Sequence, residues 1–255
     1  MNFDCIVNFV LCLCTKSAPN SRIVGGTQIT ISQSPMTAAL LFSTTNSGHR
    51  HRCGGTIIAR RAILTAAYCT SGTVPARWRT RVGATYANSG GTVVNTQRII
   101  NHPSYNSFTR DSDIAIIRTS SNLPNNNNVR SAYIPGPAYY PMDHTPVVAT
   151  GWGRTAQNGQ PSEQLRSVQI WIINQAICRQ RYAAIGRAVT DNMICAGWLD
   201  MGGRDQCVGD EGGPLILNNV VVGITSWRQG CGIPQFPGVN TRVSRFSAWV
   251  ERNAS

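Results

Sequence analysis

Short apolar runs separated by turn-forming residues recur along most of the chain. From residue 55 onward, clusters of Gly, Asn and Pro separate β-branched runs at residues 63–64, 93–94, 114–117, 147–148, 168–173 and 215–224. Short runs rich in β-branched residues and bounded by turn residues are typical of strands rather than helices. The pattern therefore predicts an all-β fold.

One hairpin and one helix can be assigned from the same pattern. Asn218 and Asn219 separate two apolar runs, and Asn tolerates the left-handed backbone that a tight hairpin turn requires. At the end of the chain, apolar residues at helical spacing predict a helix over about 243–252: Val243, Phe246, Trp249 and Val250. The asparagine-rich stretch at 124–128 is interpreted as a linker between two halves.

Composition limits the class of protein. The chain has 255 residues, 42% of them hydrophobic and 13% charged, which suits one compact domain rather than a disordered chain. No apolar run reaches the roughly 18 residues of a membrane-spanning helix, so no membrane partner is expected. The formal net charge is +12, but 22 of the 23 basic residues are scattered arginines. Scattered arginines argue against a nucleic-acid partner.

The N-terminal segment predicts secretion. Residues 5–14 are mostly apolar, and the small residues Ser17 and Ala18 follow, as in a secretory signal with its cleavage region. We therefore expect a signal peptide over 1–18 and an extracellular product.

Cysteine usage agrees with that compartment. Three of the nine cysteines lie in the leader, and six remain: Cys53, Cys69, Cys178, Cys195, Cys207 and Cys231. An even six favours disulfides in an oxidising compartment, although spacing alone leaves 15 connectivities open. None of the six forms a C-x-x-C pair near histidine, so no metal or other cofactor is expected.

Four segments carry the candidate chemistry. They are Arg-Ile-Val-Gly-Gly at 22–26, Leu-Thr-Ala-Ala-Tyr-Cys at 64–69, Asp-Ile-Ala-Ile at 113–116 and Gly-Asp-Glu-Gly-Gly-Pro at 209–214. With Cys-Gly-Gly-Thr at 53–56 and Gly-Trp-Gly at 151–153, they resemble trypsin-like members of the chymotrypsin family of serine peptidases. The resemblance covers residues 23–255. Stretches at 163–166 and 203–207 are most similar to midgut trypsins of moths and butterflies, which suggests a gut lumen.

The resemblance implies a fold and three disulfides. The family fold has two six-stranded antiparallel β-barrels, here about 23–130 and 131–242, with a C-terminal helix and a short activation peptide at 19–22. Such proteins are expected to be monomers. The implied pairings are Cys53 with Cys69, Cys178 with Cys195, and Cys207 with Cys231.

The sequence departs from the family at two of three catalytic positions. Asp113 matches the triad aspartate, with the hydroxyl of Ser226 as its expected partner, but Tyr68 stands in place of histidine and Glu211 in place of serine. A phenol is a poor base near neutrality. The family's oxyanion hole, formed by the backbone N–H groups of Gly209 and Glu211, would here face a carboxylate.

Other family positions concern specificity. Asp205 matches the carboxylate at the base of the trypsin pocket and Gly238 a wall glycine, whereas Arg228 replaces a second wall glycine. The Arg228 side chain has three options, which are to reach Asp205, to turn toward Glu211 or to enter solvent.

Activation is also implied by the resemblance. A trypsin-like protease is expected to cleave between Arg22 and Ile23. The new ammonium group of Ile23 would then insert beside Asp210.

Three functions follow from these residues. The first is a catalytically inactive serine protease homologue that binds protease inhibitors or peptides with Arg or Lys side chains. The second is a trypsin-like digestive endopeptidase that cleaves after Arg or Lys. The third is a binder of anionic glycans or surfaces through the arginine excess.

Overall fold

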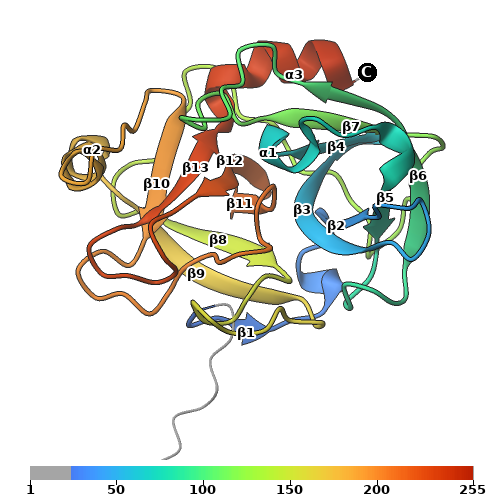
Figure 1. Ribbon diagram of the computed structural model, residues 1–255, viewed down its shortest axis with the longest axis horizontal. Coiled ribbons are helices and arrows are strands. Elements are labelled where there is room, and N and C mark those ends of the chain that lie inside the picture. The colour runs from blue at the N-terminus through green and yellow to red at the C-terminus, as the bar shows by residue number, and fades with distance from the viewer. Residues whose placement is uncertain (1–23, 255) are drawn as a thin grey trace, which may run out of the picture.

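Two β-barrels lie side by side and form most of the molecule (Figure 1). The computed structural model describes residues 24–254. The predicted signal and activation peptides, the Arg22–Ile23 cleavage site and Ser255 lie outside the described residues. Each barrel is a closed antiparallel sheet of six strands, so the predicted all-β architecture is confirmed.

The first barrel has the strand order β2-β3-β4-β7-β6-β5. Its inward-facing apolar side chains form one core with Trp78 and Ile116 among its members. Its strands are β2 (Thr37–Phe42), β3 (Arg50–Ala59), β4 (Ala62–Thr65), β5 (Trp78–Val82), β6 (Thr92–Asn101) and β7 (Ala115–Thr119). The helix α1 (Ala67–Thr70) follows β4 directly and carries Tyr68.

The second barrel closes through pairing of its first two strands. Its order is β9-β10-β13-β12-β11-β8, with β8 pairing back to β9 and the short strand β1 (Thr27–Gln28) added beside β9. The strands are β8 (Pro146–Gly151), β9 (Arg166–Ile172), β10 (Met193–Gly197), β11 (Pro214–Leu217), β12 (Val220–Trp227) and β13 (Gly238–Arg242). The helix α2 (Gln175–Ala183) lies between β9 and β10 in the chain.

The predicted hairpin is confirmed. Asn218 and Asn219 connect β11 to β12, with φ angles of 49° and 64°. Two consecutive residues with positive φ form the type of turn that matches the twist of paired strands. The strand β11 of this hairpin follows the segment that contains Glu211, and Ser226 lies near the end of β12.

The C-terminal helix begins later than predicted. Residues Val243–Phe246 form a 3₁₀ turn, and α3 spans Ser247–Ala254. The hydroxyl of Ser247 donates to the carbonyls of Ser244 (2.9 Å) and Pro135 (2.6 Å), and this local bonding competes with a regular first turn. Phe246 and Val250 are buried in the core of the first barrel, so α3 packs across that barrel (Figure 1).

Three disulfides are present within the described residues. They join Cys53 to Cys69, Cys178 to Cys195 and Cys207 to Cys231, the pairings that the resemblance implied. The first anchors α1 to β3, and the third ties the segment before Glu211 to the loop after β12.

Candidate functional site

The buried carboxylate of Asp113 organises one half of the candidate site. Its Oδ1 accepts the backbone N–H of Tyr68 at 2.7 Å, and its Oδ2 accepts the hydroxyl of Ser226 at 2.5 Å. Thr241 donates to its backbone carbonyl at 2.6 Å. Burial raises the pKa of Asp113, and the Ser226 and Tyr68 hydrogen bonds oppose that rise. The expected partnership of Asp113 with Ser226 is therefore present.

Tyr68 contacts Asp113 through its backbone. Its backbone rather than its hydroxyl bonds the carboxylate, and the residue is 43% exposed. The guanidinium of Arg110 stacks over the ring with its central carbon 3.5 Å from the centroid, and it lies 3.9 Å from Oδ2 of Asp113. No pattern in the sequence pointed to Arg110. Its backbone has a φ of 62°, which is unusual for arginine and gives no signal in the sequence.

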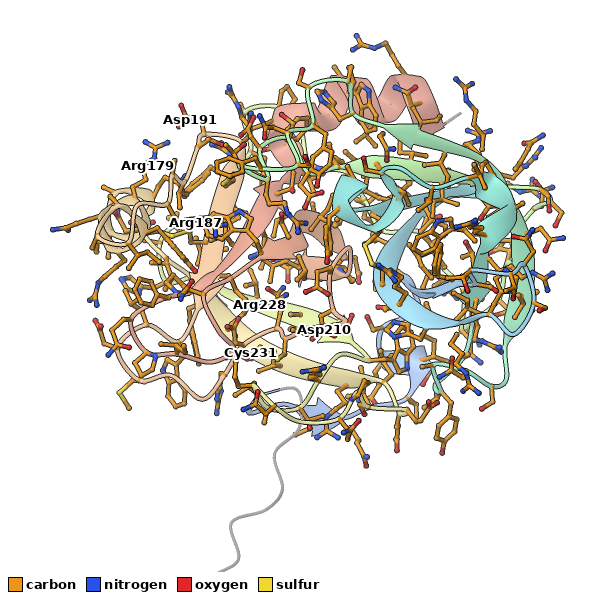
Figure 2. The ribbon with its side chains drawn as sticks, viewed as in Figure 1. Arg179, Arg187, Asp191, Asp210, Arg228 and Cys231 are labelled. Atoms are coloured by element: carbon orange, nitrogen blue, oxygen red, sulfur yellow. A yellow bond between two sulfur atoms is a disulfide. The ribbon has the colours of Figure 1, made fainter. Side chains whose placement is uncertain are left out.

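Glu211 and Arg228 organise the other half. One carboxylate oxygen of Glu211 accepts from the Arg228 guanidinium at 2.7 Å, and the other accepts the backbone N–H of Gly209 at 2.7 Å. The two side chains are only 13% and 7% exposed. Of the three options for Arg228, the structure therefore selects the turn toward Glu211. Figure 2 shows Arg228 near the centre of the molecule.

The backbone of Glu211 is held against the first barrel. Its carbonyl accepts the N–H of Gly54 at 2.8 Å. Gly54 lies on β3, and a Cβ at this position would come within 2.6 Å of the Gly213 backbone. The absence of a side chain at Gly54 thus lets the segment 209–214 approach the barrel that carries Tyr68 and Asp113.

Asp205 is a second buried carboxylate that interacts with the charge of Arg228. It is 1% exposed, and its Oδ2 accepts the N–H of Gly232 at 3.0 Å. Burial raises the pKa of Asp205 to about 7, while the positive charge of Arg228 and the Gly232 hydrogen bond act in the opposite direction. A Cβ on Gly238 would lie 2.8 Å from Oδ1 of Asp205, so only glycine leaves this carboxylate its space.

Asp210 is bound by backbone amides. Its oxygens accept the N–H groups of Gly153 (2.8 Å) and Cys207 (2.9 Å). Burial raises its pKa to about 6 against these hydrogen bonds. Cβ atoms on Gly151 or Gly153 would fall within 2.5 Å of the Asp210 carboxylate. The Gly-Trp-Gly segment therefore forms the wall of this carboxylate site, a role that the sequence analysis did not assign.

The comparisons with known proteins agree with this fold. A family model described as Trypsin matches residues 23–250. The chain belongs to the trypsin family. It is 56% identical over 233 residues to "Trypsin, alkaline B" of Manduca sexta, with 91% of each chain covered. It is 52% identical over 247 residues to "Trypsin CFT-1" of Choristoneura fumiferana, with 96% of each covered.

A third relative carries another name. "Achelase-1" of Lonomia achelous is 48% identical over 236 residues, which cover 91% of this chain and all of that protein.

The described residues of this trypsin-family chain contain no group of three His, Cys, Asp or Glu side chains arranged to hold a metal ion. No helix within residues 24–254 is long and apolar enough to cross a membrane.

Proposed function

We propose that this chain is a non-catalytic trypsin-family protein that binds protease inhibitors or basic peptide segments. In this proposal Tyr68, Asp113 and Glu211 occupy the triad positions. The observation that carries the proposal is the pair of contacts made by Glu211, one to Arg228 and one to the N–H of Gly209. With these two contacts, the charged side chains of Glu211 and Arg228 occupy the position where a substrate would react.

The chemistry of these residues supports loss of catalysis. Acyl transfer needs a nucleophile, a base within hydrogen-bond reach and donors for the developing oxyanion. Glu211 is an anion already bound by the Gly209 amide, so it competes with an oxyanion for the same donor. The backbone of Tyr68, rather than its ring, contacts Asp113, which leaves no relay from that carboxylate to a base. Loss of the nucleophile or base in a triad lowers turnover on the order of a million-fold.

The pocket that contains Asp205 supports a role in binding basic side chains, but Arg228 weakens that binding. Asp205 offers a carboxylate to an Arg or Lys side chain, as bidentate recognition requires. Arg228, however, already supplies a buried guanidinium near that carboxylate. A basic partner must displace Arg228, so the side chain acts as an intramolecular competitor.

Calorimetric titration of the processed protein with a small trypsin inhibitor that presents Arg tests the binding role. We expect micromolar binding, a loss of tenfold or more in Asp205→Asn, and a gain in Arg228→Gly. The matched control is Arg245→Gln, an exposed arginine outside the site, which should bind as the parent does. Failure of both the parent and Arg228→Gly to bind would contradict the proposal.

A second candidate function is trypsin-like endopeptidase activity in digestion. The names of the relatives favour it over the binding proposal, because chains of 52% and 56% identity are called trypsins. The residues at positions 68 and 211 oppose it. Hydrolysis of an Arg-containing reporter by the processed parent would decide for this candidate.

A further inference from the structure

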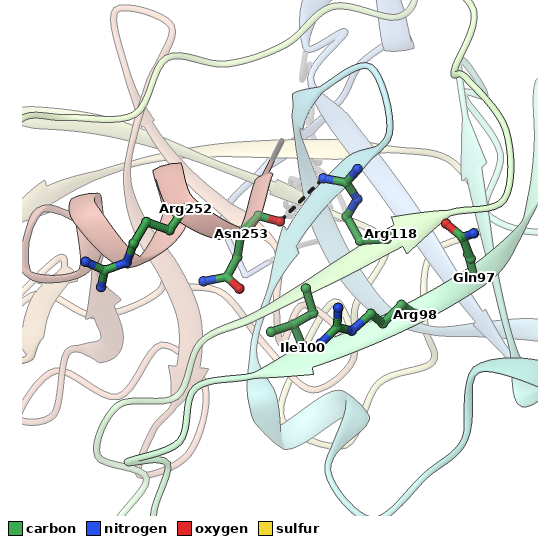
Figure 3. A pocket seen from close by; sticks show the side chains of 6 residues that line it. All are labelled: Gln97, Arg98, Ile100, Arg118, Arg252 and Asn253. Atoms are coloured by element: carbon green, nitrogen blue, oxygen red, sulfur yellow. Dashed lines mark hydrogen bonds between the residues drawn. The ribbon is translucent and has the colours of Figure 1, made fainter.

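A cavity lined by three arginines lies outside the site described above. It has a volume of about 460 Å³ and opens between β6, β7 and the end of α3 (Figure 3). Its lining consists of Gln97, Arg98, Ile100, Arg118, Arg252 and Asn253. These residues come from three separate parts of the chain, so the sequence alone gives no sign of the cavity.

The strand register places two of the arginines against each other. Arg98 on β6 and Arg118 on β7 are directly opposed partners in the antiparallel pair. Like charges directly opposite one another destabilise a sheet. The register shifts between Thr96 and Arg98, a bulge of the kind that redirects side chains. The strand pairing thus places two arginines next to each other.

The third arginine comes from the last turn of α3. A cation at this end is favourable for the helix itself. Arg118 donates to the carbonyl of Asn253 at 3.5 Å, which joins β7 to the end of the helix (Figure 3). Arg252, the residue before Asn253, also lines the cavity.

No carboxylate of the described residues lines this cavity. Neither Arg98 nor Arg252 belongs to an ion pair formed among residues 24–254. Both side chains are exposed. Two arginines that line one cavity therefore have no ion-pair partner among residues 24–254, and both can bind an anion from outside this part of the chain.

We propose that the cavity binds a sulfate ester carried on a sugar chain. Arg98 and Arg252 supply planar forks of N–H donors, which suit tetrahedral oxyanions, and Arg118 adds positive charge. The cavity volume of about 460 Å³ exceeds what a single ion fills. Ile100 offers an apolar contact for a sugar ring, and no aromatic side chain lines the cavity for stacking of bases. The inference stands independently of the proposed function.

The test uses calorimetry with a trisulfated disaccharide, its unsulfated form, inorganic sulfate and a DNA duplex as probes. We expect the sulfated disaccharide to bind more tightly than sulfate and to weaken when salt is raised. Arg98→Gln/Arg252→Gln should lose at least tenfold. Arg179→Gln/Arg181→Gln removes the same charge from α2 in the other barrel and should change affinity less than twofold.

Several results would overturn the proposal. Equal losses in both double variants would assign binding to net charge alone. Equal affinity for inorganic sulfate would exclude the glycan as the ligand, and tighter binding of the duplex would make nucleic acid the partner. A measurement on the unaltered protein gives a result that does not depend on whether the variants fold. The amide signals of Ile100 and Asn253 should shift on addition of the sulfated disaccharide, and unshifted signals would reject the site.

Discussion

The guanidinium of Arg228 lies 2.7 Å from the carboxylate of Glu211, and both side chains are largely buried. Neighbouring carboxylates strengthen this arrangement, because the negative charges of Glu211, Asp205 and Asp210 together outweigh burial and raise the pKa of Arg228. Removal of one member of a buried ion pair leaves the other charge without compensation. Substitution of either Arg228 or Glu211 should therefore change both the free energy of unfolding and the charge in the candidate site.

Arg228→Gly should destabilise the protein because Glu211 then keeps a largely buried charge. We expect a loss of about 3 kcal/mol in the free energy of unfolding, measured by urea denaturation. In Arg228→Gly/Glu211→Ser the loss should be smaller than the sum of the two single losses. Additive losses in this double-mutant cycle would show that the two side chains do not interact.

The stability contributed by Asp205 and Asp210 should fall as pH rises from about 4 to 7. The folded-state pKa of Asp205 is raised to about 7 and that of Asp210 to about 6, above their ordinary value of 3.8. In this window these two carboxyl groups bind more protons in the folded state than in the unfolded state, so their contribution to the free energy of unfolding decreases with pH. Above about pH 7 this contribution is fully lost. His51, whose pKa burial lowers to about 4, contributes in the opposite direction.

The Asp205→Asn variant isolates the larger of these two effects. Asn retains an oxygen to accept the Gly232 N–H but does not titrate. Between pH 4 and 7 the stability of the variant relative to the parent should increase with pH, because the parent alone loses the contribution of Asp205. An unchanged slope in urea denaturation at several pH values would contradict the assigned protonation of Asp205.

Gly153→Ala should be severely destabilising. Its Cβ would lie 2.5 Å from the Asp210 carboxylate carbon, and the carboxylate would have to leave the amides that bind it. Gly136→Ala is the matched control, because a Cβ there meets no atom within 4 Å and its backbone φ is not positive. The melting temperature should drop for Gly153→Ala and stay within a few degrees for Gly136→Ala.

Ser226→Ala tests the hydrogen bond to Asp113. The hydroxyl opposes the effect of burial on this carboxylate, so its removal should raise the pKa of Asp113 further. Loss of a hydrogen bond to a buried charged group costs about 1–3 kcal/mol. Urea denaturation at neutral pH should detect this loss. A variant as stable as the parent would mean that the Ser226 hydroxyl contributes nothing to holding Asp113.

Local patterns and family resemblance account for different parts of what was predicted. The Asn218-Asn219 turn follows from backbone preferences, and the all-β fold follows from the spacing of apolar runs. The contact between Ser226 and Asp113 was expected from the resemblance. The direction of Arg228 was left open, because it depends on which of two buried carboxylates compensates its loss of hydration better.

Other features had no local signal. Arg110 reaches Tyr68 through an unusual backbone conformation at arginine. The arginine cavity arises from strand register and from the position of α3, which only the folded chain defines. The 3₁₀ turn before α3 depends on hydrogen bonds of Ser247 with residues that include the distant Pro135. Each of these depends on contacts between separated segments.

The most direct test of the central claim is hydrolysis of an Arg-containing reporter peptide by processed, repurified protein. It should be run beside Tyr68→His/Glu211→Ser and the same variant with Arg228→Gly added. The account predicts a silent parent and activity that appears on restoring histidine and serine and increases when Arg228 is removed. Hydrolysis by the parent, free of the activating protease, would contradict the non-catalytic account and establish the endopeptidase function.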